Sequence, residues 1–272
     1  MSGFRLAAVD LDGTLLRSDR TISARTRAAV AQARKADMDV VFVTARHAAA
    51  IEGFVSDLDL TGEAVCCIGT AVYELPSATL TWSSPITAAA CREISRRISD
   101  GFPGLHLGWA LESGPLGYQP GYPGPLLMGP SFHADPLSID GPVLKMWVVG
   151  ERLGEHRPAE LARALTGLAD IGHHGRGFAD LVAPGVTKAG TLRQLCEARG
   201  IEARQVVAFG DAEADLPMLE WAGHGVMMAN GRPELHALAD EVAPGCDEDG
   251  VAVVLERIVR SSIAGGPRPD HR

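Results

Sequence analysis

The sequence lacks the features that mark several classes of protein. Its five cysteines include no Cys-x-x-Cys pair and are odd in number, which argues against a zinc site or a disulfide framework. No apolar run is long enough to span a bilayer, and no charged N-terminal segment leads into a long apolar stretch as in a signal peptide. The net charge of −9 argues against a nucleic-acid partner, which selects basic surfaces. We therefore expect a cytoplasmic protein with reduced, mostly buried thiols and neither membrane nor nucleic acid among its partners.

The stretch around which the chain is organised is Asp10-Leu11-Asp12-Gly13-Thr14. The short apolar run Leu6–Val9 precedes it and predicts a buried parallel strand. Open α/β sheets carry their chemistry at the carboxyl ends of such strands. Two carboxylates this close repel each other, and a bound cation is the usual compensation. The pair therefore predicts a metal site.

Strand and helix patterns alternate in the two end portions of the chain. The first portion predicts strands at residues 6–9, 39–44 and 64–68, with helices at 24–37, after the N-cap Ser23, and at 47–58. The last portion predicts helices at 187–199, 233–239 and 249–261 and strands at 205–211 and 225–229. Such alternation is typical of a parallel sheet with crossover helices.

The middle block has a different pattern. It predicts helices at 87–99 and 158–168 and strands at 105–111, 143–149, 170–174 and 178–183. We expect Trp109 and Trp147 in a core, the alternative being a contact to a substrate. The Gly/Pro-rich stretch 114–142 predicts a long irregular loop. We therefore expect an α/β fold, with a Rossmann-like parallel-sheet core domain at 1–84 and 184–272. An α+β cap domain, residues 85–183, is inserted in it.

The strand ends carry a set of residues suited to phosphoryl transfer. Asp10, Asp12 and Asp211 offer hard oxygen ligands, which suit octahedral Mg²⁺. Thr44 and Lys188 offer a hydroxyl donor and a positive charge for phosphate oxygens. A free carboxylate can attack phosphorus to give an aspartyl-phosphate, while a second carboxyl group protonates the leaving alcohol.

At these residues the chain resembles the haloacid dehalogenase (HAD) superfamily, and in particular its Cof-type sugar-phosphate phosphatases. Asp10 to Thr14 match the first motif, DxDGT, and Thr44 the second. Lys188, in Gly185-Val186-Thr187-Lys188, matches the third motif, and Gly210-Asp211-x-x-x-Asp215 the fourth. The resemblance covers residues 5–84 and 184–260, and in the cap it is one of topology.

The resemblance implies a role for each matching residue. Asp10 would be the nucleophile and a Mg²⁺ ligand, and Asp12 the general acid/base and a ligand through its backbone carbonyl. Asp211 would bind Mg²⁺ through its side chain, and Asp215 would support the metal shell. Three residues, Thr44, Lys188 and Arg46, would bind the substrate phosphate, Arg46 alternatively being a surface charge.

The chain departs from the family pattern at three positions. Ala45 stands where the second motif has glycine, Ile68 where an Asn-Gly pair follows the third strand, and Ala214 where the fourth motif often has asparagine. These changes leave the core reaction intact and leave the substrate and the effect of Ala214 open.

Asp12 favours a phosphatase or phosphomutase, because an alcohol leaving group needs a proton and a halide does not. The large cap favours a small phosphorylated metabolite as substrate, and we expect Mg²⁺-dependent hydrolysis of sugar phosphates. One alternative is a phosphomutase or phosphotransferase that uses the same aspartyl-phosphate. Another is a catalytically silent phosphometabolite-binding module, although such a protein should have lost Asp10 or Asp12. A monomer and a homodimer are both compatible with the sequence.

Overall fold

The computed structural model describes residues 3–51, 61–124, 129–151, 153, 157–175 and 177–264. They form two compact units, one made of Met1–Val43 and Leu192–Arg272 and the other of Thr44–Thr191. Among the described residues, no helix combines the length and the apolar character that a membrane span requires. All five cysteines are buried and free, as predicted.

The first unit is built on parallel strands in the order β14-β13-β12-β1-β2. Their bounds are Leu6–Val9 for β1, Asp39–Val43 for β2, Val206–Gly210 for β12, His224–Met228 for β13 and Glu241–Ala243 for β14. The central strand β1 is fully buried, because it is short and apolar on both faces. Its register pairs Val9 with Phe209, so the residues that follow β1 and β12 leave the sheet at the same edge.

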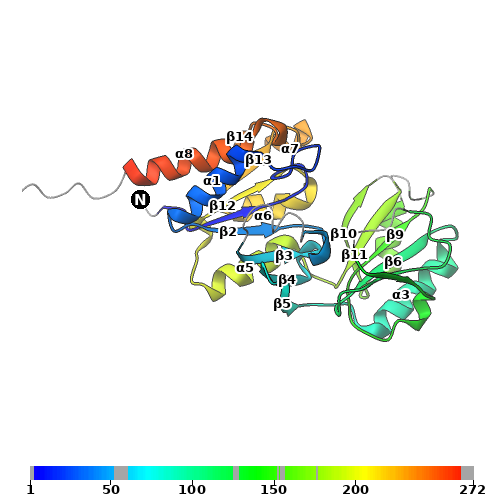
Figure 1. The fold of residues 1–272 in the computed structure, drawn as a ribbon. Helices are drawn as coiled ribbons and strands as arrows, with labels where there is room; N and C mark the ends of the chain where they lie inside the picture. The colour runs from blue at the N-terminus through cyan, green and yellow to red at the C-terminus, as the bar shows by residue number, and fades with distance from the viewer. Residues whose placement is uncertain are drawn as a thin grey trace, which may run out of the picture. The chain divides into compact units, whose positions relative to one another are not determined.

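In the first unit, the helices predicted to start at residues 24, 233 and 249 begin within one residue of those positions. The bounds of the unit's helices are Ala24–Lys35 for α1, Leu216–Trp221 for α6, Pro233–His236 for α7 and Gly250–Ala264 for α8, with 3-10 turns η4 (Ala203–Gln205), η5 (Glu213–Asp215) and η6 (Cys246–Glu248). The predicted N-cap of α1 is confirmed, since Ser23 Oγ accepts the Thr26 N–H at 2.9 Å. Helices α1 and α8 pack side by side (Figure 1).

The second unit begins with a three-stranded antiparallel arrangement that the sequence did not predict in full. Strands β3 (Gly62–Cys66), β4 (Ala71–Leu75) and β5 (Thr79–Ser83) pair in that order, with 3-10 turns η1 (Ala48–Ala50) and η2 (Cys67–Gly69) before β3 and β4. The β4–β5 hairpin was missed because its short strands carry Glu, Ser and Thr beside apolar residues. The helix predicted at 47–58 starts as the 3-10 turn η1, and residues 52–60 of it lie outside the described residues.

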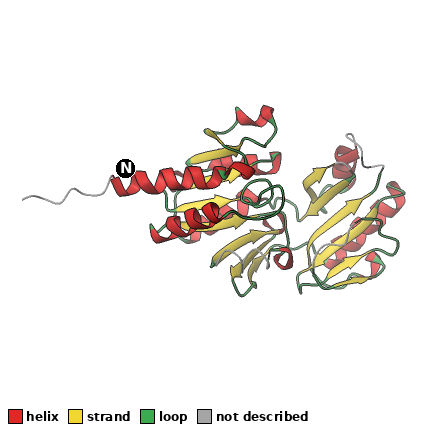
Figure 2. Ribbon diagram, turned by 45° about the horizontal axis from the view of Figure 1, so that its top comes forward, coloured by secondary structure: helices red, strands yellow, loops and turns green. Residues whose placement is uncertain are grey.

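A second sheet of the same unit has the strand order β10-β11-β9-β6-β7-β8. Figure 1 labels β10, β11, β9 and β6 in it, and Figure 2 draws its strands in yellow. Its strands are β6 (His106–Leu111), β7 (Leu116–Tyr118), β8 (Ser131–His133), β9 (Val143–Val149), β10 (Asp170–Gly175) and β11 (Phe178–Val182). The accompanying helices are α3 (Ala88–Gly101), α4 (Arg157–Ala164) and the 3-10 turn η3 (Pro136–Ser138), and α5 (Lys188–Ala198) follows β11. Trp109 and Trp147 lie in its apolar clusters, as predicted.

The prediction of an irregular loop over 114–142 is wrong, since β7, β8 and η3 lie within it. Gly117 shows the reason. A Cβ placed there would lie 2.0 Å from the Trp109 ring, so this glycine makes room for an aromatic ring inside a sheet. The predicted fold class is confirmed: the protein is α/β, with a mainly parallel core sheet and an inserted second sheet. The predicted cap boundaries, 85–183, stay a prediction.

Candidate active site

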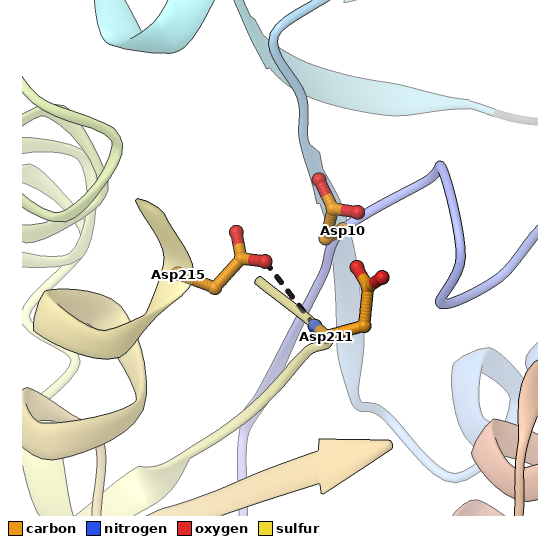
Figure 3. A group of neighbouring side chains, drawn as sticks. All are labelled: Asp10, Asp211 and Asp215. Atoms are coloured by element: carbon orange, nitrogen blue, oxygen red, sulfur yellow. Dashed lines mark hydrogen bonds between the residues drawn. The ribbon is translucent and has the colours of Figure 1, made fainter. Parts of the chain in front are cut away.

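Three aspartates converge at one edge of the first unit's sheet (Figure 3). Asp10 follows β1, Asp211 follows β12 and Asp215 ends the turn η5. One carboxylate oxygen of each lies within 4.8 Å of the others, and Asp10 and Asp215 are buried. Parallel pairing of β1 with β12 brings Asp10 and Asp211 together although they lie 201 positions apart in the sequence.

Hydrogen bonds fix the orientation of two of these carboxylates, Asp215 and Asp211. Asp215 Oδ2 accepts the Asp211 N–H at 3.2 Å (Figure 3) and the Ala212 N–H at 3.1 Å. The Thr14 hydroxyl donates to Asp211 Oδ1 at 3.2 Å. Grouped carboxylates in a buried setting are costly without a cation, and a hard oxygen set of this kind fits a divalent metal. This group can therefore hold a metal ion.

The close packing around Asp211, one of the three grouped aspartates, requires glycine at position 13. Its φ is +76°, and a Cβ there would lie 2.3 Å from Asp211 Oδ2. We expect Gly13→Ala to push Asp211 aside, weakening Mg²⁺ binding by about tenfold or more and costing about 1–2 kcal/mol of stability. The measurement is the rise of the melting temperature with Mg²⁺ concentration. Gly121→Ala is the control, since Gly121 has φ +78° and no atom within 4 Å of its Cβ position. Equal metal responses in both variants would contradict the prediction.

Asp12 lies apart from the group of three carboxylates, in an exposed position of the turn after β1. The turn is closed by backbone hydrogen bonds from Leu15 to Asp10 at 3.2 Å and from Leu16 to Leu11 at 2.8 Å. Leu11 and Thr14 are buried on either side of it. Asp12 therefore lies exposed in a turn whose neighbouring residues are buried, an accessible position that suits a proton-transfer group.

Sequence reasoning missed Asn230, which supports the same turn. Its Nδ2 donates to the Gly13 carbonyl at 2.8 Å, and its Oδ1 accepts the Cys246 N–H at 2.8 Å. The structure shows what Asn230 does: one amide links the Gly13 turn to the start of η6.

The other predicted site residues belong to the second unit. Thr44 is buried, and its Oγ1 accepts the Arg46 N–H at 3.1 Å. Lys188 is buried at the first position of α5, where Thr187 caps the helix by accepting the Gly190 N–H at 3.0 Å. The structure thus groups Asp10, Asp211 and Asp215 in the first unit. The assignment of Thr44, Arg46 and Lys188 to phosphate binding stays a prediction.

Gly69 is the glycine that the chain retains from the family's Asn-Gly pair. A Cβ there would lie 2.4 Å from the Thr187 carbonyl oxygen, and its φ is +104°. Its own carbonyl accepts the Thr191 hydroxyl at 2.6 Å. The loop after β3 therefore packs directly against the first turn of α5, the helix that carries Lys188. Only glycine, which has no Cβ, fits at position 69 in this contact.

His47 is a buried neighbour of the second motif. Burial, together with the charges of Lys145 and Arg46, lowers its pKa from 6.5 to about 4. Among the described residues its Nε2 has no hydrogen-bond partner.

We expect the free energy of unfolding to fall as the pH drops from 6.5 towards 4. In that window the unfolded chain takes up a proton at this position that the folded chain does not, at a cost of up to about 3 kcal/mol. Urea denaturation across this range measures the slope, which His47→Gln should flatten. His133→Gln, at an exposed position, should leave it unchanged. Identical slopes for all three proteins would refute the assignment.

Comparison with known proteins identifies the family. The chain matches the haloacid dehalogenase-like hydrolases over residues 7–111 and 151–255. The pyridoxal phosphate phosphatase YbhA of Escherichia coli (strain K12) is 28% identical over 266 residues, covering 91% of this chain and 96% of that protein. An HMP-PP phosphatase of Serratia proteamaculans (strain 568) is 27% identical, covering 95% of this chain and 96% of that protein.

A solved structure has the same fold. It is a haloacid dehalogenase-like hydrolase from Bacteroides thetaiotaomicron, with a TM-score of 0.81 and 25% identity, covering 94% of this chain and 99% of that one. The family match extends over well more than half of the chain, and the prediction made from the four motifs is confirmed. The chain belongs to the haloacid dehalogenase-like hydrolase family and is a phosphatase of its Cof type.

Proposed function

We propose that the protein is a Mg²⁺-dependent phosphatase of small phosphorylated metabolites that works through an aspartyl-phosphate on Asp10. The observation that carries the proposal is the cluster of three carboxylates, Asp10, Asp211 and Asp215, at the ends of β1 and β12. Asp12 lies exposed two residues beyond Asp10. This arrangement supplies a nucleophile, a place for a cation and a separate proton-transfer group. A silent binding module would need only the cation site.

The proposed reaction has two steps. In the first, an Asp10 carboxylate oxygen bonds to phosphorus, the bond from phosphorus to the ester oxygen breaks, and Asp12 gives its proton to the departing alkoxide. In the second, water attacks phosphorus and Asp12 takes its proton. The bond between phosphorus and Asp10 then breaks, which restores the Asp10 carboxylate and releases orthophosphate. Both aspartates end as they began.

The charge of the phosphoryl group needs compensation in both steps. Asp10, Asp211 and Asp215 would hold the Mg²⁺, which neutralises part of that charge when bound. Thr44 would donate its hydroxyl hydrogen to a phosphate oxygen, and Lys188 and Arg46 would supply positive charge. In this proposal the cap, residues 85–183, carries the contacts to the rest of the substrate.

The substrate class is the open part of the proposal. Sugar phosphates are the expectation from the sequence resemblance, whereas the two curated relatives act on pyridoxal phosphate and HMP-PP. We propose a small phosphorylated metabolite within this range, hydrolysed in the cytoplasm by a monomer or a homodimer.

Phosphate release from a substrate panel tests the proposal. The panel contains several sugar phosphates, pyridoxal phosphate, HMP-PP and p-nitrophenyl phosphate, each with Mg²⁺ and with excess EDTA. We expect orthophosphate to appear in amounts equal to the alcohol released, and only with the metal. Less orthophosphate than alcohol, with phosphate found on an added sugar, would instead favour a phosphotransferase. No turnover of any substrate, with phosphate still binding, would favour the silent module.

A further inference from the structure

Every peptide carbonyl of the segment Thr44-Ala45-Arg46 accepts a hydrogen bond from the second unit. The Thr44 carbonyl accepts the Ile68 N–H at 3.1 Å, and the Arg46 carbonyl accepts the Cys67 N–H at 2.8 Å. The middle carbonyl, of Ala45, accepts instead from a side chain, the Lys145 ammonium, at 3.1 Å. Lys145 lies on β9, 100 residues further along the chain.

The Ala45 carbonyl and the Arg46 N–H belong to the same peptide group. In a trans peptide they point in opposite directions, so partners on both sides fix the plane of the group. Lys145 Nζ donates to the Ala45 carbonyl oxygen, and Thr44 Oγ1 accepts the Arg46 N–H at 3.1 Å. Because Thr44 Oγ1 accepts the Arg46 N–H, its own hydrogen points away from that N–H and can be donated elsewhere.

Lys145 is itself buried and held in place. Its Nζ lies 3.1 Å from Asp180 Oδ1, and both residues are less than a tenth exposed. Asp180 lies on β11 opposite Trp147, which makes it a diagonal neighbour of Lys145 on one face of the sheet. The Trp147 ring centroid is 5.8 Å from Nζ. Lys145 therefore has a single orientation.

Stability alone does not explain such a pair. Removing two charges from water costs free energy that their attraction repays only in part, and apolar pairs of similar size are often as stable. The third partner of the ammonium, the Ala45 carbonyl, is the feature an apolar pair cannot replace. The pair therefore acts on the segment that carries Thr44.

We propose that Lys145 is a positioning residue for phosphate binding: through the Ala45–Arg46 peptide it aims the Thr44 hydroxyl at a phosphate oxygen, and Asp180 holds it there. This rests on the proposed function only in taking Thr44 as a phosphate ligand. Lys145 itself touches neither substrate nor metal in this scheme. Its removal should therefore weaken phosphate binding more than it slows the chemical step.

The test uses the double variant K145M/D180L, which removes both charges together and so leaves no buried ion unpaired. Calorimetry measures the binding of orthophosphate in the presence of Mg²⁺. Steady-state kinetics with p-nitrophenyl phosphate give KM and kcat, and thermal melting shows whether each variant is folded. K145R keeps a cationic donor, and K35M, on the exposed side of α1, controls for the loss of a lysine.

We expect the Kd of orthophosphate and the KM to rise together by about tenfold in K145M/D180L, with kcat changed less. K145R and K35M should stay near the wild type. A folded double variant with unchanged Kd would overturn the proposal, as would a K145R variant as weak as K145M/D180L. If the double variant does not fold, D180N decides, with a rise of about threefold expected and an unchanged Kd overturning the proposal.

The calorimetric measurement distinguishes failure of the proposed phosphatase function from failure of the proposed role of Lys145. A wild type that binds orthophosphate but releases none from p-nitrophenyl phosphate contradicts the proposed function and still tests Lys145. A wild type that neither binds nor releases phosphate overturns both.

Discussion

Asp10→Asn is expected to abolish phosphate release, with kcat lowered on the order of 10⁴-fold or more. The amide oxygen of asparagine is a poor nucleophile, and no covalent intermediate can form on it. The side chain keeps its size, and its place after β1 is set by a fully buried strand, so the fold should persist. Single-turnover release of p-nitrophenol and orthophosphate measures the loss.

A second readout distinguishes this chemical loss from damage to the fold. Asp10 is one of three grouped carboxylates, so its neutralisation should relieve repulsion in the metal-free protein. Metal-free Asp10→Asn should therefore melt at or above the temperature of the metal-free wild type at pH 7. Asp37→Asn, at an exposed position of the same unit, is the matched control and should change neither quantity. Phosphate release at the wild-type rate by Asp10→Asn would sink the assignment of the nucleophile.

The grouping of Asp10 with Asp211 was within reach of the sequence. Both follow short apolar runs, and such runs become parallel strands whose carboxyl ends meet at one edge. The starts of two helices were also predictable from the sequence. Ser23 and Thr87 precede them, and the hydroxyl of each accepts a hydrogen bond from the backbone N–H three residues further on. These signals are local, because a cap or a strand end involves neighbours in sequence.

The features that sequence reasoning missed depend on distant partners. Gly117 indicates a loop when read alone, but it lies in β7 under the ring of Trp109. Lys145 falls in the middle of an apolar run and gives no sign of its partners Ala45 and Asp180. Only the pairing of β9 with β11 brings the ammonium and the carboxylate together.

Removal of the metal is expected to have the second large effect. Dialysis against EDTA should reduce phosphate release to background, and Mg²⁺ should restore it, because three grouped carboxylates without a cation repel one another and an incoming phosphate alike. Binding should also stabilise the fold, by about 2.7 kcal/mol at a concentration one hundred times Kd. The melting temperature of the wild type should therefore rise with Mg²⁺.

Asp211→Asn tests whether this response comes from the proposed group. Asparagine keeps the acceptor oxygen for the Thr14 hydroxyl but removes the charge, so Mg²⁺ affinity should fall by about 10–100-fold while the fold is retained. Activity at saturating Mg²⁺ should recover further in Asp211→Asn than in Asp10→Asn, since only the latter loses the nucleophile. An EDTA-treated wild type that keeps full activity, or an Asp211→Asn variant with an unchanged Mg²⁺ titration, would place the cation elsewhere and remove the basis for a metal at the junction of β1 and β12.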